Sequence, residues 1–200
     1  MASVLDSTAL VTLAQLKAYL GPEFTGTTWD AALEGIINSV SVMFDGYVKR
    51  TLAKTTYTNL YLDGNGQETL WLPNWPIVSI TSIYEDDTLL VEGEDYDYYP
   101  DSGELIRLDG VWFKGKKTVL ITYAAGYIVQ GGTAGTGETA LPKDIVHACF
   151  MQSAREWKKT QGSAWGVNSQ SFPDGSITRF EGGLLKEVKE ILDHYTRYGI

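Results

Sequence analysis

Apolar residues recur with the spacing of an amphipathic helix in four stretches of the chain. The longest pattern runs over residues 27–52, and its apolar positions fall three or four apart: Leu33, Ile37, Val40, Phe44 and Val48. Shorter patterns predict helices at residues 12–20, at residues 141–161 and from Leu184 onward. Because each helix has one apolar face to bury, we expect the four to pack against one another.

The ends of two of these helices carry their own signals. Thr12 and Gln15 have the spacing of a capping box, and Pro22 stands where the first helix must stop. In the helix at 141–161, Pro142 and Asp144 suit the first turn, where no N–H partner is needed and a negative charge is favoured. Four apolar residues predict its buried face: Val146, Phe150, Ala154 and Trp157.

Between residues 55 and 128 the apolar period changes to that of β-strands. We expect six or seven short strands there, joined by short connections and paired as an antiparallel meander. The sequence DGNG at 63–66 predicts a hairpin, PDSG at 100–103 predicts a turn, and Asp86-Asp87 predicts an acidic turn between two strands. The clearest strand pattern covers residues 118–123.

These patterns predict an α+β fold, in which a four-helix bundle core is interrupted by an antiparallel β-rich insertion. Residues 1–54 and 141–200 would form one discontinuous helical domain, and residues 55–128 the insertion. A Gly/Thr-rich linker at 129–140 would join the two. The polar, Gly-rich stretch at 162–182 predicts a loop that is long for a compact domain, as functional or partner-ordered segments are.

Composition narrows the classes of function. The 200 residues carry a formal net charge of −9, which disfavours a protein that grips nucleic-acid phosphates. One cysteine excludes an internal disulfide and suits a reducing compartment, and no stretch predicts a transmembrane helix or a signal peptide. Six Trp and twelve Tyr suit either protein interfaces or a β-rich core.

The only cysteine, Cys149, stands two positions after one of the two histidines, His147. On a helix such residues point about 200° apart, so they cannot share a proton. We therefore expect Cys149 to be buried packing and His147 to face outward or toward a neighbouring subunit. No other pattern supplies a nucleophile with a base, and we expect neither an enzyme nor a cofactor.

Two further patterns imitate binding sites. Residues 132–139, GTAGTGET, resemble a phosphate-binding loop, but Glu138 occupies the position where a lysine must meet the phosphates. An acidic run could in principle bind calcium or hydrolyse glycosides, although its spacing is not that of an EF-hand. Its members are Glu85, Asp86, Asp87, Glu92, Glu94, Asp95, Asp97, Asp101 and Glu104.

Three motifs in order suggest a family. The pattern L-x-L-P-x-x-P-[IV]-x-S-[IV] is met by LWLPNWPIVSI at 70–80, a strand ends in ITYAAGY at 121–127, and a helix begins with LPKDIVHA at 141–148. With the helices that flank them, these segments make the chain, over about residues 10–198, resemble the head-tail connector (adaptor or head-completion) proteins of long-tailed phages.

The resemblance implies a structural virion protein rather than an enzyme. It implies a ring, typically of about twelve subunits, below the portal. The ring would extend the DNA channel and present a docking surface to the next stopper, head-completion or tail-completion protein. Double-stranded DNA would pass through the lumen without sequence-specific binding, with no membrane involved. Such a protein is assembled in the host cytoplasm and resides at the head-tail interface.

In the same family the C-terminal segment docks on the portal. Carried over by position, this implies a portal-docking set on the last helix and tail: Leu184, Val188, Ile191, Tyr195, Tyr198 and Ile200. The polar loop at 162–182 is our candidate for the part that faces DNA. The alternative interpretation is a calcium- or carbohydrate-binding β module of a phage tail accessory protein.

Overall fold

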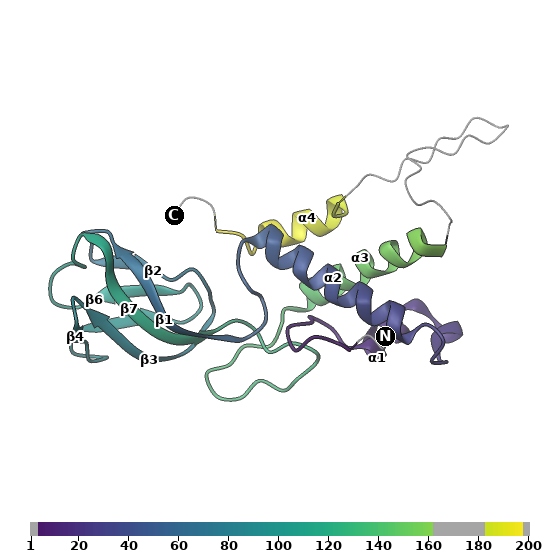
Figure 1. Cartoon of the computed structure of the whole chain (residues 1–200), viewed down its shortest axis with the longest axis horizontal. Coiled ribbons are helices and arrows are strands. Elements are labelled where there is room, and N and C mark those ends of the chain that lie inside the picture. The colour runs from purple at the N-terminus through teal and green to yellow at the C-terminus, as the bar shows by residue number, and fades with distance from the viewer. Residues whose placement is uncertain (1–3, 162–182, 198–200) are drawn as a thin grey trace. The chain divides into compact units, whose positions relative to one another are not determined.

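The computed structural model describes residues 4–161 and 183–197, and these residues form two compact units. The helical unit combines the described residues up to Lys49 with those from Pro142 to Arg197, and the β unit comprises Arg50–Leu141. The chain therefore leaves the helical unit once and returns to it once (Figure 1).

Four α-helices and a short 3₁₀ helix make up the described part of the helical unit. Their bounds are α1 Leu13–Leu20, η1 Pro22–Phe24, α2 Asp30–Val48, α3 Lys143–Gln161 and α4 Lys186–Asp193. The long helices α2 and α3 pack against each other, and α1 and α4 each contact both of them (Figure 1).

The predicted four-helix bundle core is wrong. Such a bundle needs four helices of similar length around one shared core. Here α2 and α3 have 19 residues each, whereas α1 and α4 have 8 each. Two turns of helix cannot follow a partner of five turns along its length. The unit is instead a pair of long helices with two short helices against it.

The buried faces of the two long helices differ in how well the pattern predicts them. All five predicted apolar positions of α2 are buried, which confirms that face. On α3 the predicted stripe is displaced: of its four members only Trp157 is buried, and the others are half-buried. The buried face of α3 is a mixed set: Ile145, Ala148, Cys149, Gln152, Ser153 and Trp157. Because this face contains polar residues, a search for apolar periodicity selects the neighbouring one.

The start of α1 confirms the predicted capping box. The Thr12 hydroxyl accepts the Gln15 N–H at 3.1 Å, and the Gln15 side chain accepts the Thr12 N–H at 2.8 Å. Gly21 ends the helix at a φ of 122°, a conformation that side chains disfavour. Pro22 then opens the 3₁₀ turn, so the first helix stops where predicted.

The β unit contains seven strands in two antiparallel sheets. They are β1 Thr55–Gly64, β2 Thr69–Trp71, β3 Ile77–Glu85, β4 Thr88–Leu89, β5 Tyr96–Tyr99, β6 Glu104–Arg107 and β7 Gly115–Ala125. One sheet has the order β1-β7-β3-β4, and the other has the order β2-β6-β5.

This order contradicts the predicted meander. In a meander each strand pairs with its neighbour in sequence, but β1 pairs with β7 and β2 pairs with β6. The DGNG sequence at 63–66 therefore joins two strands that belong to different sheets, and the hairpin predicted there is wrong. Turn chemistry fixes a change of direction, but long-range packing chooses the partner strand.

Two other turns behave as their residues predict. Asp86 and Asp87 have φ angles of 46° and 63° and turn the chain between β3 and β4, which pair as a hairpin. Gly103, at a φ of 70°, closes the turn between β5 and β6. Asp86 and Asp87 thus suit the turn between β3 and β4, because aspartate tolerates a positive φ better than most side chains.

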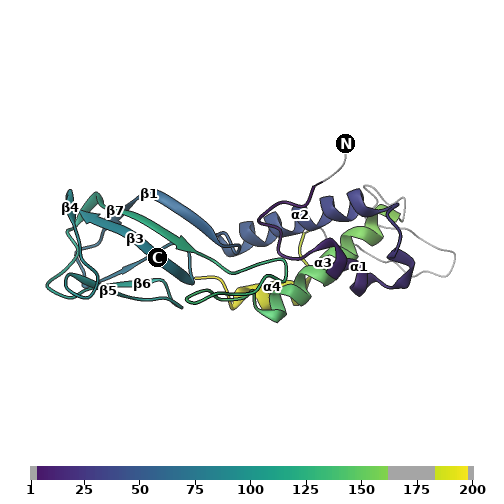
Figure 2. The same cartoon turned by 90° about the horizontal axis from the view of Figure 1, so that it is seen from below.

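The two sheets enclose one core. Figure 2 shows β5 and β6 in one layer and β1, β7 and β3 in another. Inward side chains from both sheets form a single cluster, with partly buried side chains around it. The cluster comprises Leu70, Leu72, Ile77, Ile83, Leu90, Tyr96, Leu105, Trp112, Val119, Ile121, Tyr123 and Ala125.

Candidate functional site

Two of the three motifs that carry the family resemblance meet around one buried arginine in the β unit. The Arg50 side chain is only 5% exposed, and its guanidinium lies 3.9 Å from the centroid of the Trp75 ring and 5.6 Å from that of Tyr127. It also donates a hydrogen bond to the Trp75 carbonyl. Arginine suits this position because its flat cation stacks on aromatic faces.

The glycine of the second motif is required by close packing. Gly126 has a φ of 110°, and a Cβ there would lie 2.6 Å from the Ala53 carbonyl oxygen. The next residue, Tyr127, is paired through both of its backbone groups. Its N–H donates to the Leu52 carbonyl at 2.7 Å, and its carbonyl accepts the Lys54 N–H at 2.8 Å. These motif residues thus close the base of the β unit, where its first and last strands meet. Their role in this structure is architectural.

The structure places Cys149 and His147 as predicted. Cys149 is fully buried on α3, and burial raises the pKa of its thiol to about 12 against a smaller opposing effect of a hydrogen bond with Ser153. His147 is exposed, with its ring edge-on to Tyr19 at 6.0 Å between centroids. A neutral, buried thiol is not a nucleophile.

The loop that imitates a phosphate-binding site is tied down within the β unit. Lys54 forms an ion pair with Glu138, and the Gly135 N–H donates to the same carboxylate at 2.8 Å. These contacts, the Lys54 hydrogen bond above all, lower the pKa of Glu138. The loop returns to the body where Ile128 and Ala140 form a β-bridge. Its acidic residue therefore serves an internal contact.

The acidic run is dispersed by the fold. Glu85 is buried, accepts the Phe113 N–H at 2.8 Å, and lies 3.5 Å from Arg107, which is also 3.7 Å from Asp95. Within residues 4–161 and 183–197, no three His, Cys, Asp or Glu side chains gather so that they could hold a metal ion. The calcium alternative gains no support from this geometry.

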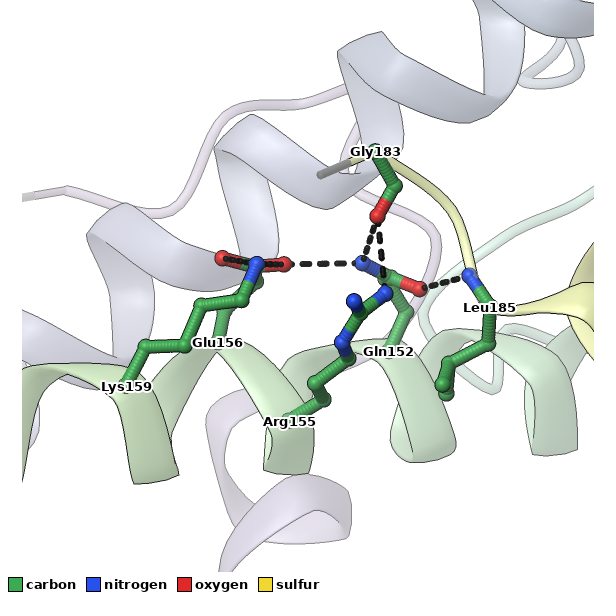
Figure 3. Close-up of polar contacts among 6 residues, drawn as sticks. All are labelled: Gln152, Arg155, Glu156, Lys159, Gly183 and Leu185. Carbon is green, nitrogen blue, oxygen red and sulfur yellow. Dashed lines mark hydrogen bonds and ion pairs between the residues drawn. The ribbon is translucent and has the colours of Figure 1, made fainter. Parts of the chain in front are cut away.

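The segment predicted to dock on the portal is held to α3 by a buried glutamine. Gln152 is fully buried; its amide nitrogen donates to Glu156 at 2.8 Å and to the Gly183 carbonyl at 3.3 Å, and its oxygen accepts the Leu185 N–H at 3.0 Å (Figure 3). Arg155 donates to the same Gly183 carbonyl at 2.9 Å. One side chain thus satisfies the backbone on both sides of Leu184.

The predicted docking residues divide between the inside and the surface of the helical unit. Leu184 and Val188 are buried together with Leu192, so they hold α4 in place. Ile191 and Tyr195 are half-buried, and the Tyr195 hydroxyl lies 2.8 Å from both carboxylate oxygens of Asp144. Tyr198, Ile200 and the predicted DNA-facing loop at 162–182 lie outside the described residues.

The β unit exposes large apolar side chains that sequence reasoning did not single out as a site. Nine of them are at least 37% exposed: Tyr61, Trp71, Tyr84, Leu89, Val91, Tyr99, Leu108, Val111 and Phe113. The alternation of side chains along these strands indicated that each strand has two different sides. Which of the two sides is buried depends on the sheet that covers it. Isolated exposed apolar residues are ordinary, whereas neighbouring ones indicate an interaction surface.

The exposed apolar side chains of the β unit favour the class of structural proteins that act through protein interfaces. In the described part of the chain, no helix is long and apolar enough to cross a membrane. Glu85 and Glu138 are engaged in internal contacts, and Cys149 is buried.

Comparison with known families agrees with this class. The family model described as "Head completion protein" matches residues 9–198. The chain belongs to the head completion protein family, and it is a phage-type structural virion protein rather than an enzyme. The resemblance inferred from the three motifs is thereby confirmed.

Solved structures share the fold along the whole chain. A chain in the neck of an empty GTA particle, computed with C6 symmetry, has a TM-score of 0.63 at 19% identity. One in the neck of a native GTA particle, computed with C12 symmetry, has 0.61 at 17%, and one from the virion of a native gene transfer agent (GTA) particle has 0.61 at 18%. Each alignment covers 99% of this chain and 94% of the other. No curated protein sequence matches this chain.

Proposed function

We propose that this protein is the subunit of a ring at the head-tail interface of a phage-type virion. The ring lies below the portal, extends the DNA channel, and offers a docking surface to the next stopper, head-completion or tail-completion protein. The observation that carries this is the match of the head completion family model to residues 9–198. The likeness to neck chains in structures of C6 and C12 symmetry supports a ring, of about twelve copies in the second case.

The acidic charge of the protein fits a channel for DNA. With a net charge of −9, a lumen formed by many copies would repel phosphates rather than bind them. Double-stranded DNA would then slide through without sequence-specific contacts. A single buried cysteine is compatible with assembly in the reducing host cytoplasm before the ring takes its place in the virion.

The C-terminal segment is our proposed portal contact. Because Leu184 and Val188 are buried within the helical unit, their part is to fix α4, and contact falls to the half-buried Ile191 and Tyr195 and to the tail beyond them. Aromatic and aliphatic side chains of this kind commonly dominate the binding energy of an interface.

Co-sedimentation with purified portal rings from the same genome, followed by negative-stain imaging, tests both parts. We expect wild-type protein to add a stoichiometric collar below the portal, and a variant that lacks residues 195–200 to lose it. Lys186→Ala is the matched control, because Lys186 lies on α4 with its side chain 85% exposed. A wild-type protein that never binds portal rings would contradict the proposed function; a truncated variant that still binds would contradict only the proposed contact.

A further inference from the structure

Each sheet of the β unit exposes a row of large side chains on the side that faces away from the shared core. We propose that these two rows bind each other between neighbouring copies of this chain, the four-stranded sheet of one copy against the three-stranded sheet of the next. This contact presupposes the ring proposed above and gives the ring its subunit interface.

The first row, here the four-strand face, crosses all four strands of its sheet. It consists of Tyr61, Leu120, Tyr84 and Leu89. Strand pairing places Tyr61 and Tyr84 on either side of Leu120, and Leu89 beside Tyr84. Directly paired residues of antiparallel strands point to the same side of a sheet. Tyr61 and Leu89 are each 54% exposed and Tyr84 is 37% exposed, so the row is open to solvent.

The second row, here the three-strand face, crosses the other sheet. It consists of Trp71, Glu104 and Tyr99, with Glu104 paired to both aromatic residues. Tyr99 is 58% exposed and Trp71 is 37% exposed. Large aromatic rings such as these are typical interface anchors, because they supply wide contact area with little flexibility.

The two faces lie on opposite sides of the β unit. Along a strand, successive side chains alternate between the two sides of the sheet. Leu105, next to Glu104, and Ile121, next to Leu120, are both fully buried in the one cluster that the sheets share. Because Leu105 and Ile121 point into this cluster, the row residues next to them, Glu104 and Leu120, point away from it. The cluster lies between the two sheets, so the two rows face in opposite directions.

A ring requires two complementary surfaces on nearly opposite sides of each subunit. In a cyclic assembly each copy meets its two neighbours through two different, complementary surfaces. In a ring of about twelve, one copy is rotated by only about 30° relative to the next, so the two surfaces must lie on nearly opposite sides of the subunit. A sheet sandwich with a large side-chain row on each outer side meets that condition.

Charges on the two faces are complementary. The Lys117 ammonium lies 5.7 Å from the centroid of the Tyr61 ring, which puts a cation on the four-strand face. Asp63 is nearby but accepts the Lys117 backbone N–H at 2.8 Å. The three-strand face carries the carboxylate of Glu104 at its centre, and the exposed Asp97 lies on the same sheet. A cation beside one aromatic row and an anion within the other favour a second copy of this chain as the occupant.

The test introduces one charge into each face. Tyr84→Glu alters the four-strand face and Tyr99→Glu alters the three-strand face; both side chains are exposed, so the melting temperature should stay near the wild-type value. We expect each variant to fail to complete a collar on portal rings, with apparent affinity reduced about ten-fold or more. Complete collars formed by either variant at wild-type occupancy would overturn the proposed interface and leave the proposed function standing.

A matched control separates surface charge from interface position. Leu108→Glu places the same charge on a residue of the β unit that is 49% exposed and belongs to neither row. We expect this variant to form collars like the wild type. A loss of collars equal to that of the row variants would show that the rows are not special, and would also overturn the proposed interface.

Sedimentation velocity at rising protein concentration tests the contact without a portal. Each variant keeps one intact face, so Tyr84→Glu alone and Tyr99→Glu alone should remain monomeric where the wild type associates. An equimolar mixture should form one-to-one dimers and stop there, because only one productive pair of faces remains. At concentrations where the wild type associates, mixtures that stay monomeric, or single variants that associate like the wild type, would overturn the proposed interface. Wild-type protein that neither associates nor fills portal rings would overturn both proposals.

Discussion

Cys149 lies on the buried face of α3 with its thiol fully removed from solvent. Burial penalises the thiolate, which is why the pKa rises from 9.0 to about 12 although Ser153 opposes the shift through a hydrogen bond. The residue therefore acts as a small packing side chain at neutral pH. Its chemistry becomes visible only when the helical unit opens or the solution is strongly alkaline.

This shift predicts how stability depends on pH. In the unfolded chain the thiol loses its proton near pH 9, whereas in the folded protein it keeps the proton up to about pH 12. Raising the pH through this window therefore favours the unfolded state, and Cys149 should cost about 1 kcal/mol of stability between about pH 8 and 10. Urea unfolding of the wild type and of Cys149→Ala at both pH values measures the difference. An equal loss in the two proteins would contradict the assignment.

At the scale of elements, α4 depends on its surroundings. A helix of 8 residues is not stable by itself in water, because the first turn is costly to form and few hydrogen bonds follow it. Three contacts compensate: buried Val188 and Leu192, the Gln152 amide on the backbone before the helix, and the Tyr47 hydroxyl, which donates to Asp193 at 2.7 Å. The proposed portal contact is thus positioned by α2 and α3.

Replacing the buried amide should loosen this helix. In Gln152→Leu the Leu185 N–H loses its acceptor while the packed volume is nearly kept, and we expect a loss of about 1–3 kcal/mol in the free energy of unfolding. Amide hydrogen exchange should rise in α4 before it rises in α2. Lys158→Ala is the control: Lys158 is exposed and lies, like Gln152, on α3, so this change should have little effect. Unchanged exchange in α4 would show that the amide does not hold it.

At the scale of the molecule, the β unit has the features of an independently folding part. It has its own core, and its ends meet: Ala53 bridges Tyr127, and Ile128 bridges Ala140. One partner of each bridge, Ala53 or Ala140, lies outside the limits 55–128 that strand patterns suggest, because these residues show no strand periodicity. Arg50, which packs on Trp75 and Tyr127, also lies outside those limits.

We therefore expect a fragment of residues 50–141 to fold on its own, with a single cooperative urea transition. The shorter fragment of residues 55–128 lacks Arg50 and both bridges at the base, and we expect it to be less stable by several kcal/mol or unfolded. Circular dichroism and urea titration of the two fragments decide this. Equal stability would mean that the base contacts contribute nothing, and an unfolded longer fragment would mean that the β unit needs the helical residues.

The sequence by itself determined those features that depend on neighbours along the chain. The period of apolar residues located α2 and its buried face, the capping box located the start of α1, and turn residues located the bends at Asp86-Asp87 and Gly103. Ordered motifs were enough to identify the family. For the helices, the cap and the turns, the physical cause acts within a few residues, so it leaves a local pattern.

The tertiary structure alone decided which elements meet. Strand β1 pairs with β7 rather than β2, α3 buries the face that contains Gln152, and Tyr61 shares a row with Tyr84. Partner choice reflects the burial of the whole chain, to which residues far apart contribute, and a local pattern is compatible with several partners. The packing of the two short helices against α2 and α3, in place of the predicted bundle, and the two outer rows of the β unit follow from that choice.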